Sequence, residues 1–238
     1  HGWNHADGRR NRSQVWRLSP ALKVEARWPE QPADATFLAA TVDEGRVAVA
    51  VSRSSAGDAP DGIGVGGVAV LSADLVLERT LVPEPLAPWF DRAFVWQAIG
   101  LHGDRLTLGL GDGRVVGAST RNLGTPVLAG EVPIAATIGT LVDSGEAVYT
   151  VTSGTSIPYG SARPEAQPPE PHPAENTVFA LDPTSLQTRW SWRGEEALHG
   201  LTFRDPWVVA GVGPKDDDPS RHGLLVFDSR REGTGQQR

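Results

Sequence analysis

The 238-residue chain contains no cysteine, and this absence excludes disulfide bonds, thiolate metal sites and a cysteine nucleophile. It also contains no methionine, and it begins with His1. Either a leader has been removed or the sequence is a trimmed piece, and we expect an exported or cell-envelope protein of bacterial origin. Apolar runs of about 18 residues are missing as well, so the sequence predicts no transmembrane segment.

Lysine is scarce, occurring only at Lys23 and Lys215, and the 29 acidic residues outnumber the 22 basic ones, so the formal net charge is −7. Because phosphate contacts need a basic surface, this balance argues against a nucleic-acid partner. The chain is long enough to bury a substantial core and to form a single domain.

Amphipathic helical periodicity is also missing, and short alternating segments take its place. The stretch "NTVFALDPTSLQTRWSW" at 176–192 predicts two strands that fold back on each other at Asp182-Pro183. Similar hairpins recur, each with a Ser or Asp before the turn: Ser19, Ser72, Ser119, Asp182 and Asp228. We expect these side chains to hydrogen-bond the backbone two residues further on. A unit that recurs about every 50 residues is typical of repeat proteins.

A second hairpin lies between successive turns, as in "TFLAATVDEGRVAVAV" at 36–51 and "VWQAIGLHGDRLTLGL" at 95–110. Four strands per unit and no helix predict an all-β fold, a β-propeller of about five four-stranded blades. We expect one propeller domain over 1–238. Its blades are placed at about 1–30, 35–83, 94–131, 134–193 and 197–238, with a Pro-rich insertion at 157–175.

The two end units are atypical. The first offers only its last two strands, in which Leu22, Val24, Ala26 and Trp28 are expected to share one packed face. The fifth lacks a clear fourth strand, because "REGTGQQR" at 231–238 does not alternate. The chain therefore forms either a compact five-bladed ring with unusual end blades or part of a larger ring.

The segment "VFALDPTSLQTRW" at 178–190 resembles the repeat of quinoprotein-like propellers, whose blades carry spaced Ala, Asp, Thr, Gly and Trp. Ala180, Asp182 and Thr184 match that pattern, a Ser-Leu pair replaces the Gly, and Trp190 arrives one residue late. The resemblance implies the propeller fold over most of the chain and implies no cofactor. Propellers of this kind include quinone-dependent dehydrogenases, envelope assembly scaffolds and WD40-like scaffolds.

Connection lengths differ between the two edges of the predicted blades. With the strands labelled a to d from the axis outward, the a–b and c–d turns are short. The long connections are b–c, at 53–67, 153–175 and 213–223, and d–a, at 82–93, whereas the third blade closes b–c tightly at 111–113. Because the strands alternate in direction, b–c and d–a connections leave from the same edge. Variable loops on a rigid frame often carry function, so we expect this b–c/d–a face to be the working surface.

The candidate binding residues on this face are Trp89, Phe90, Asp91, Arg92, Tyr159, Arg163, His172 and His222. Trp and Arg are enriched at interface hot spots, and Phe among interface residues generally. The rings of Trp89 and Phe90 can equally fold inward to cover the gap between two blades. The insertion at 157–175 is either a docking arm or a solvated, polyproline-like segment.

Other patterns favour structural roles. The run at 62–67 satisfies G-x-G-x-x-G but precedes a predicted strand rather than a helix, so it indicates a flexible loop. Asp216, Asp217 and Asp218 are only weak metal candidates, because they match no calcium loop, and we expect no metal site. The tryptophans of the strands are expected to pack between blades: Trp28, Trp96, Trp192 and Trp207.

These patterns favour a non-catalytic binding or scaffolding propeller, without a cofactor, that engages a protein or a small ligand through the b–c/d–a face. The alternative is a small propeller enzyme with its site at the channel mouth. Such an enzyme would be a carbohydrate- or lactone-active hydrolase or lyase, or, less favoured, a quinone-dependent oxidoreductase. The first residues to consider for it are Asp91, Arg92, His199 and Asp216.

Overall fold

The computed structural model describes residues 13–33, 35–52, 67–83, 95–110, 113–121, 128–129, 137–153, 174–213, 222–230 and 235–237. All regular structure in these ranges is β-strand, so the all-β prediction is confirmed. The same ranges contain no helix that is long and apolar enough to cross a membrane.

The strands form five antiparallel sheets, numbered here in chain order. Sheet 1 has two strands, β1 (Ser13–Leu18) and β2 (Val24–Ala33). Sheet 2 consists of β3 (Thr36–Asp43), β4 (Arg46–Ser52), β5 (Val68–Ser72) and β6 (Leu77–Leu81). Sheet 3 consists of β7 (Val95–His102), β8 (Arg105–Leu110), β9 (Val115–Ser119) and β10 (Leu128–Ala129).

The last two sheets repeat this order. Sheet 4 consists of β11 (Thr137–Asp143), β12 (Val148–Ser153), β13 (Thr177–Leu181) and β14 (Thr188–Arg193). Sheet 5 consists of β15 (Ala197–Arg204), β16 (Trp207–Gly213), β17 (Gly223–Asp228) and β18 (Gly235–Gln237). In sheets 2 to 5 each strand pairs with the strand next to it in the chain.

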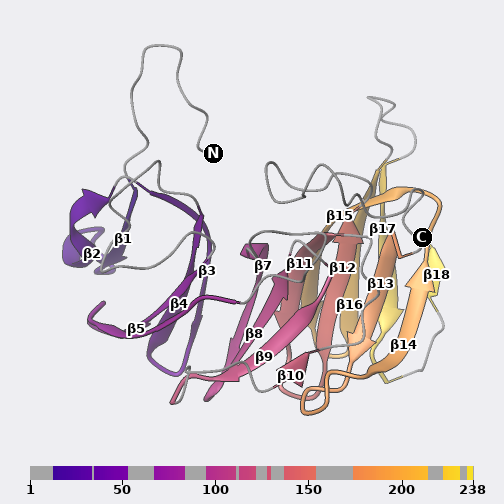
Figure 1. The fold of residues 1–238 in the computed structure, drawn as a ribbon. Coiled ribbons are helices and arrows are strands. Elements are labelled where there is room, and N and C mark those ends of the chain that lie inside the picture. Colours follow the sequence, from indigo (N-terminus) through magenta and orange to yellow (C-terminus); the bar gives the residue numbers. More distant parts are fainter. Residues whose placement is uncertain are drawn as a thin grey trace, which may run out of the picture.

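The five sheets follow one another along an arc, from sheet 1 at one end to sheet 5 at the other (Figure 1). The first strands of sheets 2 to 5 pack side by side: β3 against β7, β7 against β11, and β11 against β15. Sheet 1 contacts sheet 2 through β1 and β3. The strands of the described part do not close into a ring, because sheets 1 and 5 lie at opposite ends of the arc.

The turn chemistry predicted from the sequence is confirmed at several hairpins. The Ser72 hydroxyl accepts a hydrogen bond from the Asp74 N–H at 3.2 Å, and the Ser119 hydroxyl accepts one from the Arg121 N–H at 3.2 Å. The Asp182 carboxylate accepts from the Thr184 N–H at 2.9 Å in the same way. Each side chain therefore stabilises the reversal that it precedes.

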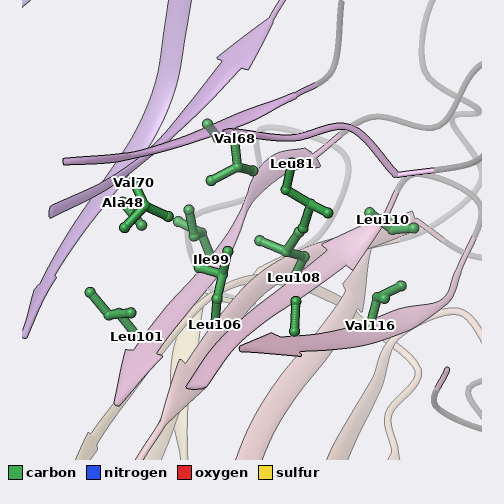
Figure 2. Packing of buried hydrophobic residues seen from close by; sticks show 12 residues of the cluster. Ala48, Val68, Val70, Leu81, Ile99, Leu101, Leu106, Leu108, Leu110 and Val116 are labelled. Carbon is green, nitrogen blue, oxygen red and sulfur yellow. The ribbon is translucent and has the colours of Figure 1, made fainter. Parts of the chain in front are cut away.

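Alternation along the middle strands places apolar groups on both faces of a sheet. In β4, Val49 and Val51 pack toward sheet 1, whereas Ala48 and Ala50 pack toward sheet 3. Figure 2 shows the second of these layers, in which residues of sheet 2 meet those of β7, β8 and β9. Leu106 is among the fully buried residues there. Burial of one such side chain contributes about 1.5–3 kcal/mol.

Glycines let sheet 4 approach sheet 3 closely. A Cβ added at Gly109 would lie 2.1 Å from Ile138 Cγ2, and one added at Gly100 would lie 2.7 Å from Leu141 Cδ2. A Cβ at Gly117 would lie 3.4 Å from Leu186 Cδ1. One face of sheet 3 is thus shaped to receive bulky side chains of the next sheet.

Aromatic rings fill the layer between sheets 4 and 5. Tyr149 stacks on Phe203 with ring centroids 5.3 Å apart, and Phe227 lies 5.6 Å from both Trp190 and Trp192. Burial raises the pKa of Tyr149. The expected packing role of Trp192 is confirmed, as is that of Trp28, which is buried between sheets 1 and 2.

Three sequence expectations are wrong. Leu22 and Val24 do not share the packed face of Ala26 and Trp28; they are 78% and 45% exposed. Leu22 lies in the hairpin turn with φ of 58°, and the β1–β2 register shift beside Leu18 puts Val24 on the other face of sheet 1. Trp207 does not pack between sheets, since it is 49% exposed on sheet 5. The fifth unit does have a fourth strand, β18, because backbone pairing with β17 does not require side-chain alternation.

Candidate binding face

The three longest connections between described strands, β4–β5, β6–β7 and β12–β13, leave the same edge of the sheets. β4 ends at Ser52 and β5 begins at Val68, and β12 ends at Ser153 and β13 begins at Thr177. The turns between first and second strands, in contrast, have only two residues in sheets 2, 3 and 5. We call the edge with the β4–β5 and β12–β13 connections the loop face and the opposite edge the turn face. Turns of the opposite edge lie at the bottom of Figure 1.

Most of the predicted site residues lie outside the described residues. This applies to the aromatic and charged group Trp89, Phe90, Asp91 and Arg92, to Tyr159, Arg163 and His172 of the Pro-rich insertion, and to Asp216, Asp217 and Asp218. Their roles stay predictions. His222 is described, and it lies at the loop face just before β17.

The structure brings His222 close to His199 across the backbone of Gly213. A Cβ added at Gly213 would lie 3.2 Å from His222 Cδ2 and 3.4 Å from His199 Cδ2. Both imidazoles are exposed. Because Gly213 has no side chain, the two rings can approach the same point of the surface. They can donate or accept hydrogen bonds there.

The direction of the His199 side chain depends on a backbone irregularity that no pattern in the sequence indicates. The register of β15 with β16 shifts between Leu198 and Gly200, so His199 is the extra residue of a β-bulge. The first strands of sheets 2 and 4 shift at matching places, which leaves Leu38 and Gly139 as the extra residues. Bulges redirect side chains and are frequent beside functional sites. The inner strands therefore present three redirected positions near the loop face.

The base of the Pro-rich insertion is fixed to sheet 4 by buried polar groups. The Thr152 hydroxyl donates to the Ala174 carbonyl and accepts from the Thr177 N–H at 3.0 Å. Asn176, with φ of 53°, accepts at its carbonyl from the Gly194 N–H at 2.9 Å. The two ends of the insertion are thus held together on sheet 4, which fixes where the insertion leaves the sheet and returns to it.

Two acceptor oxygens at this base are buried without a hydrogen-bond partner among the described residues, Glu175 Oε2 and Asn176 Oδ1. Such atoms carry a desolvation cost unless a donor reaches them. They lie where the insertion returns to the sheet, directly before β13. At the loop face, these two oxygens can therefore accept hydrogen bonds from a donor outside the described residues.

The turn face differs from the loop face in that its charged side chains form ion pairs with one another. Arg46 lies 2.7 Å from Asp104, and Arg105 binds both carboxylate oxygens of Asp143 at 2.6 and 2.8 Å. The hydrogen bond from Arg46 lowers the pKa of Asp104. These pairs join sheet 2 to sheet 3 and sheet 3 to sheet 4. They act as links between neighbouring sheets, and the described part of the chain has no group of three or more His, Asp or Glu suited to a metal ion.

Comparisons with known proteins give structural matches only. No protein-family model and no curated protein sequence matches the chain. BamB from Moraxella catarrhalis aligns over 94% of this chain and 59% of its own, with a TM-score of 0.59 at 13% identity. The Pan2 WD40 domain from Neurospora crassa aligns over 92% of this chain and 57% of its own, with a TM-score of 0.57 at 14% identity.

The computationally designed Ika4 protein aligns over 82% of this chain and 91% of its own, with a TM-score of 0.54 at 15% identity. The chain thus spans most of the designed protein but less than two thirds of the BamB and Pan2 chains. Identities this low establish the fold alone. The matches to BamB and to the Pan2 WD40 domain show that the chain has a β-propeller-like fold.

Proposed function

We propose that this protein is a non-catalytic binding or scaffolding propeller that engages a protein or a small ligand through its loop face. The observation that carries the proposal is the division between the two edges. Ion pairs join the sheets at the turn face, while the long connections and the His199–His222 pair lie at the loop face. A rigid sheet frame with variable loops on one edge is a common arrangement for recognition.

Within this proposal, the predicted binding residues of the long connections complete the surface. Trp89, Phe90 and Arg92 supply anchors of the kinds found at interfaces, and Tyr159 and Arg163 belong to the insertion whose base is fixed by Thr152. The net charge of −7 favours a protein or small molecule over nucleic acid as the partner.

The proposed architecture is one domain of about five blades, with sheets 1 to 5 as the blades. Sheet 1 supplies two strands of the first blade in the described part, and sheets 2 to 5 supply four each. Of the two ring arrangements, part of a larger ring is favoured, because the end sheets lie apart (Figure 1) and have exposed apolar residues.

Site-directed photo-crosslinking tests the proposal. A crosslinking residue replaces either His222 at the loop face or Glu44 at the turn face of the full chain, and each form is irradiated in a soluble extract of the native host. We expect a discrete crosslinked species from position 222 that is lost on Trp89→Ala or on removal of 158–173. Equal crosslinking from position 44 would contradict a one-sided binding surface.

A small propeller enzyme is the second candidate, and the proximity of His199 and His222 is the observation that favours it. An imidazole at the channel mouth can act as a general base or acid with Asp91, Arg92 or Asp216. His199→Ala and His222→Ala would then abolish turnover of a carbohydrate or lactone substrate, whereas His102→Ala, at the turn face, would not. Turnover that survives both loop-face substitutions would count against this role.

A further inference from the structure

The two ends of the arc have exposed apolar faces. On sheet 1 the exposed side chains are Trp16 (58%), Leu18 (45%), Leu22 (78%) and Val24 (45%). On sheet 5 they are Trp207 (49%) and Leu224 (56%). We call these the sheet 1 end face and the sheet 5 end face. Solvent-exposed apolar groups gathered on one face mark an interaction surface.

The sheet 5 end face repeats a surface that is covered elsewhere in the molecule. Gly109 pairs with Val115 in sheet 3, and Gly211, at the same place in β16, pairs with Leu224 in sheet 5. Ile138 of the next sheet fills the space at Gly109, and Val115 is fully buried. Among the described residues, no atom lies within 4 Å of a Cβ added at Gly211. Sheet 5 therefore presents the receiving face of an inter-sheet contact, and no described residue covers that face at Gly211.

The first residue of each second strand supports the same equivalence. Arg46 of β4 and Arg105 of β8 each reach a carboxylate at the first turn of the following sheet. In sheet 5 this position is Trp207, which pairs with Arg204 as Arg105 pairs with His102. Trp207, a large apolar ring, thus stands where sheets 2 and 3 have the arginine that binds the following sheet.

The sheet 1 end face has the complementary feature, a leucine knob. Leu22, Leu75 and Leu186 occupy matching hairpin turns with φ of 58°, 58° and 59°. A left-handed conformation costs a non-glycine residue about 1–2 kcal/mol. Leu75 and Leu186 offset this cost by packing into the neighbouring sheet, where they are 5% and 1% exposed. Leu22 has the same backbone, but the described residues supply no such sheet beside it, and it is 78% exposed.

We propose that a second copy of this chain covers these faces, with the sheet 1 end face of one copy docked on the sheet 5 end face of the other. Each chain has one knob face and one receiving face, and Figure 1 places them at opposite ends of the arc. The contact continues the sheet-on-sheet stacking already present between sheets 3 and 4. Such a head-to-tail contact closes into a ring of two or more copies or extends as a filament.

The interface predicts a specific pattern among variants. Leu22→Asp with Trp16→Asp disables the knob face, and Leu224→Asp with Trp207→Asp disables the receiving face. All four side chains are exposed, so the monomer should fold. The control is Val42→Asp with Val76→Asp, which changes two valines that are 69% and 63% exposed away from the end faces.

Sedimentation velocity of the full chain over a concentration series measures the result. Wild type and the valine control are expected to self-associate, and each end-face variant is expected to stay monomeric, with association weakened by at least about tenfold. An equimolar mixture of the two end-face variants should form a heterodimer, because one intact knob face then meets one intact receiving face.

Two outcomes overturn the proposal. A wild type that stays monomeric at every concentration would mean that the end faces are closed within the chain or covered by a different protein. End-face variants that associate as strongly as wild type would place the contact elsewhere. Near-ultraviolet circular dichroism and the thermal midpoint of each variant separate loss of assembly from loss of folding. The loop-face proposal is independent of either result.

Discussion

At the scale of single residues, Gly109 in sheet 3 and Gly211 in sheet 5 occupy equivalent positions and can be compared directly. A Cβ at Gly109 would clash with Ile138 Cγ2 and with Ala98 Cβ, at 2.1 and 2.6 Å. We expect Gly109→Ala to lower the free energy of unfolding by about 1–3 kcal/mol through overpacking. The Cβ of Gly211→Ala meets no described atom within 4 Å, so this substitution should be neutral or slightly stabilising. Urea unfolding of both variants checks this, and equal losses would contradict the assigned packing.

The ionisation of the Asp182 carboxyl group makes the stability of the fold depend on pH. Hydrogen bonds from the Ser185 N–H, the Arg189 guanidinium and the Thr184 N–H hold the pKa of Asp182 well below its usual range. Because the folded-state pKa is depressed, the stabilisation is fully present above the unfolded-state pKa of about 4. It is lost as the pH falls from there toward the folded-state value.

The variant Asp182→Asn tests this linkage. Asn has no titrating carboxyl group, so the acid limb of its unfolding free energy should be shallower between about pH 4 and pH 2. We expect the variant to be less stable than wild type at pH 7 and to approach it at low pH. Urea midpoints measured across this range would contradict the assignment if the two profiles ran parallel.

At the scale of elements, the exposure of the leucine in each repeated hairpin turn depends on whether a neighbouring sheet packs against it. Leu186→Ala should lower the free energy of unfolding by about 2–5 kcal/mol, because it leaves a cavity between sheets 3 and 4. Leu22→Ala removes a side chain that is 78% exposed and should cost little in dilute, monomeric protein. Chemical denaturation of the two variants distinguishes these outcomes, and a large cost at Leu22 would mean that sheet 1 is covered within the chain.

The elements predicted from sequence are those that local physics determines. Period-two alternation and the Ser or Asp before each turn, as at Ser72 and Asp182, depend only on nearby backbone. The side on which a residue packs depends on register and on the presence of a neighbouring sheet. Trp207 is a large aromatic residue of the kind found in cores, but no described sheet packs against its side of sheet 5, so it is exposed. Val24 faces outward because of a register shift between β1 and β2.

The candidate site was harder to predict than the fold. The edge that carries the long connections could be inferred, because strand direction alone decides where a connection leaves. The approach of His199 to His222 could not, since it depends on a bulge that leaves no mark in the alternation of β15. A bulge, or the space left by a glycine, depends on how two strands pair, and the pattern of a single strand does not show that pairing.

At the scale of the whole molecule, the stacked sheets predict a gradient of stability. Sheets 3 and 4 have apolar clusters on both faces, whereas sheets 1 and 5 each have one exposed face. In repeat architectures the stability is roughly a sum over neighbouring units, so end units open first. Sheet 1 is also the smallest, with two strands in the described part.

Hydrogen exchange measures this gradient. Amides of β8, around the buried Leu106 and Leu108, should exchange only through global unfolding. Amides of β1 should exchange at least about 100-fold faster through local opening, a difference of about 2.7 kcal/mol. Uniform protection in dilute protein would contradict the open arc. A rise in protein concentration should slow exchange in β1 and β16 together, because docking of a second copy covers both ends of the arc at once. Exchange in β8 should slow as well, because association stabilises the folded chain against global unfolding.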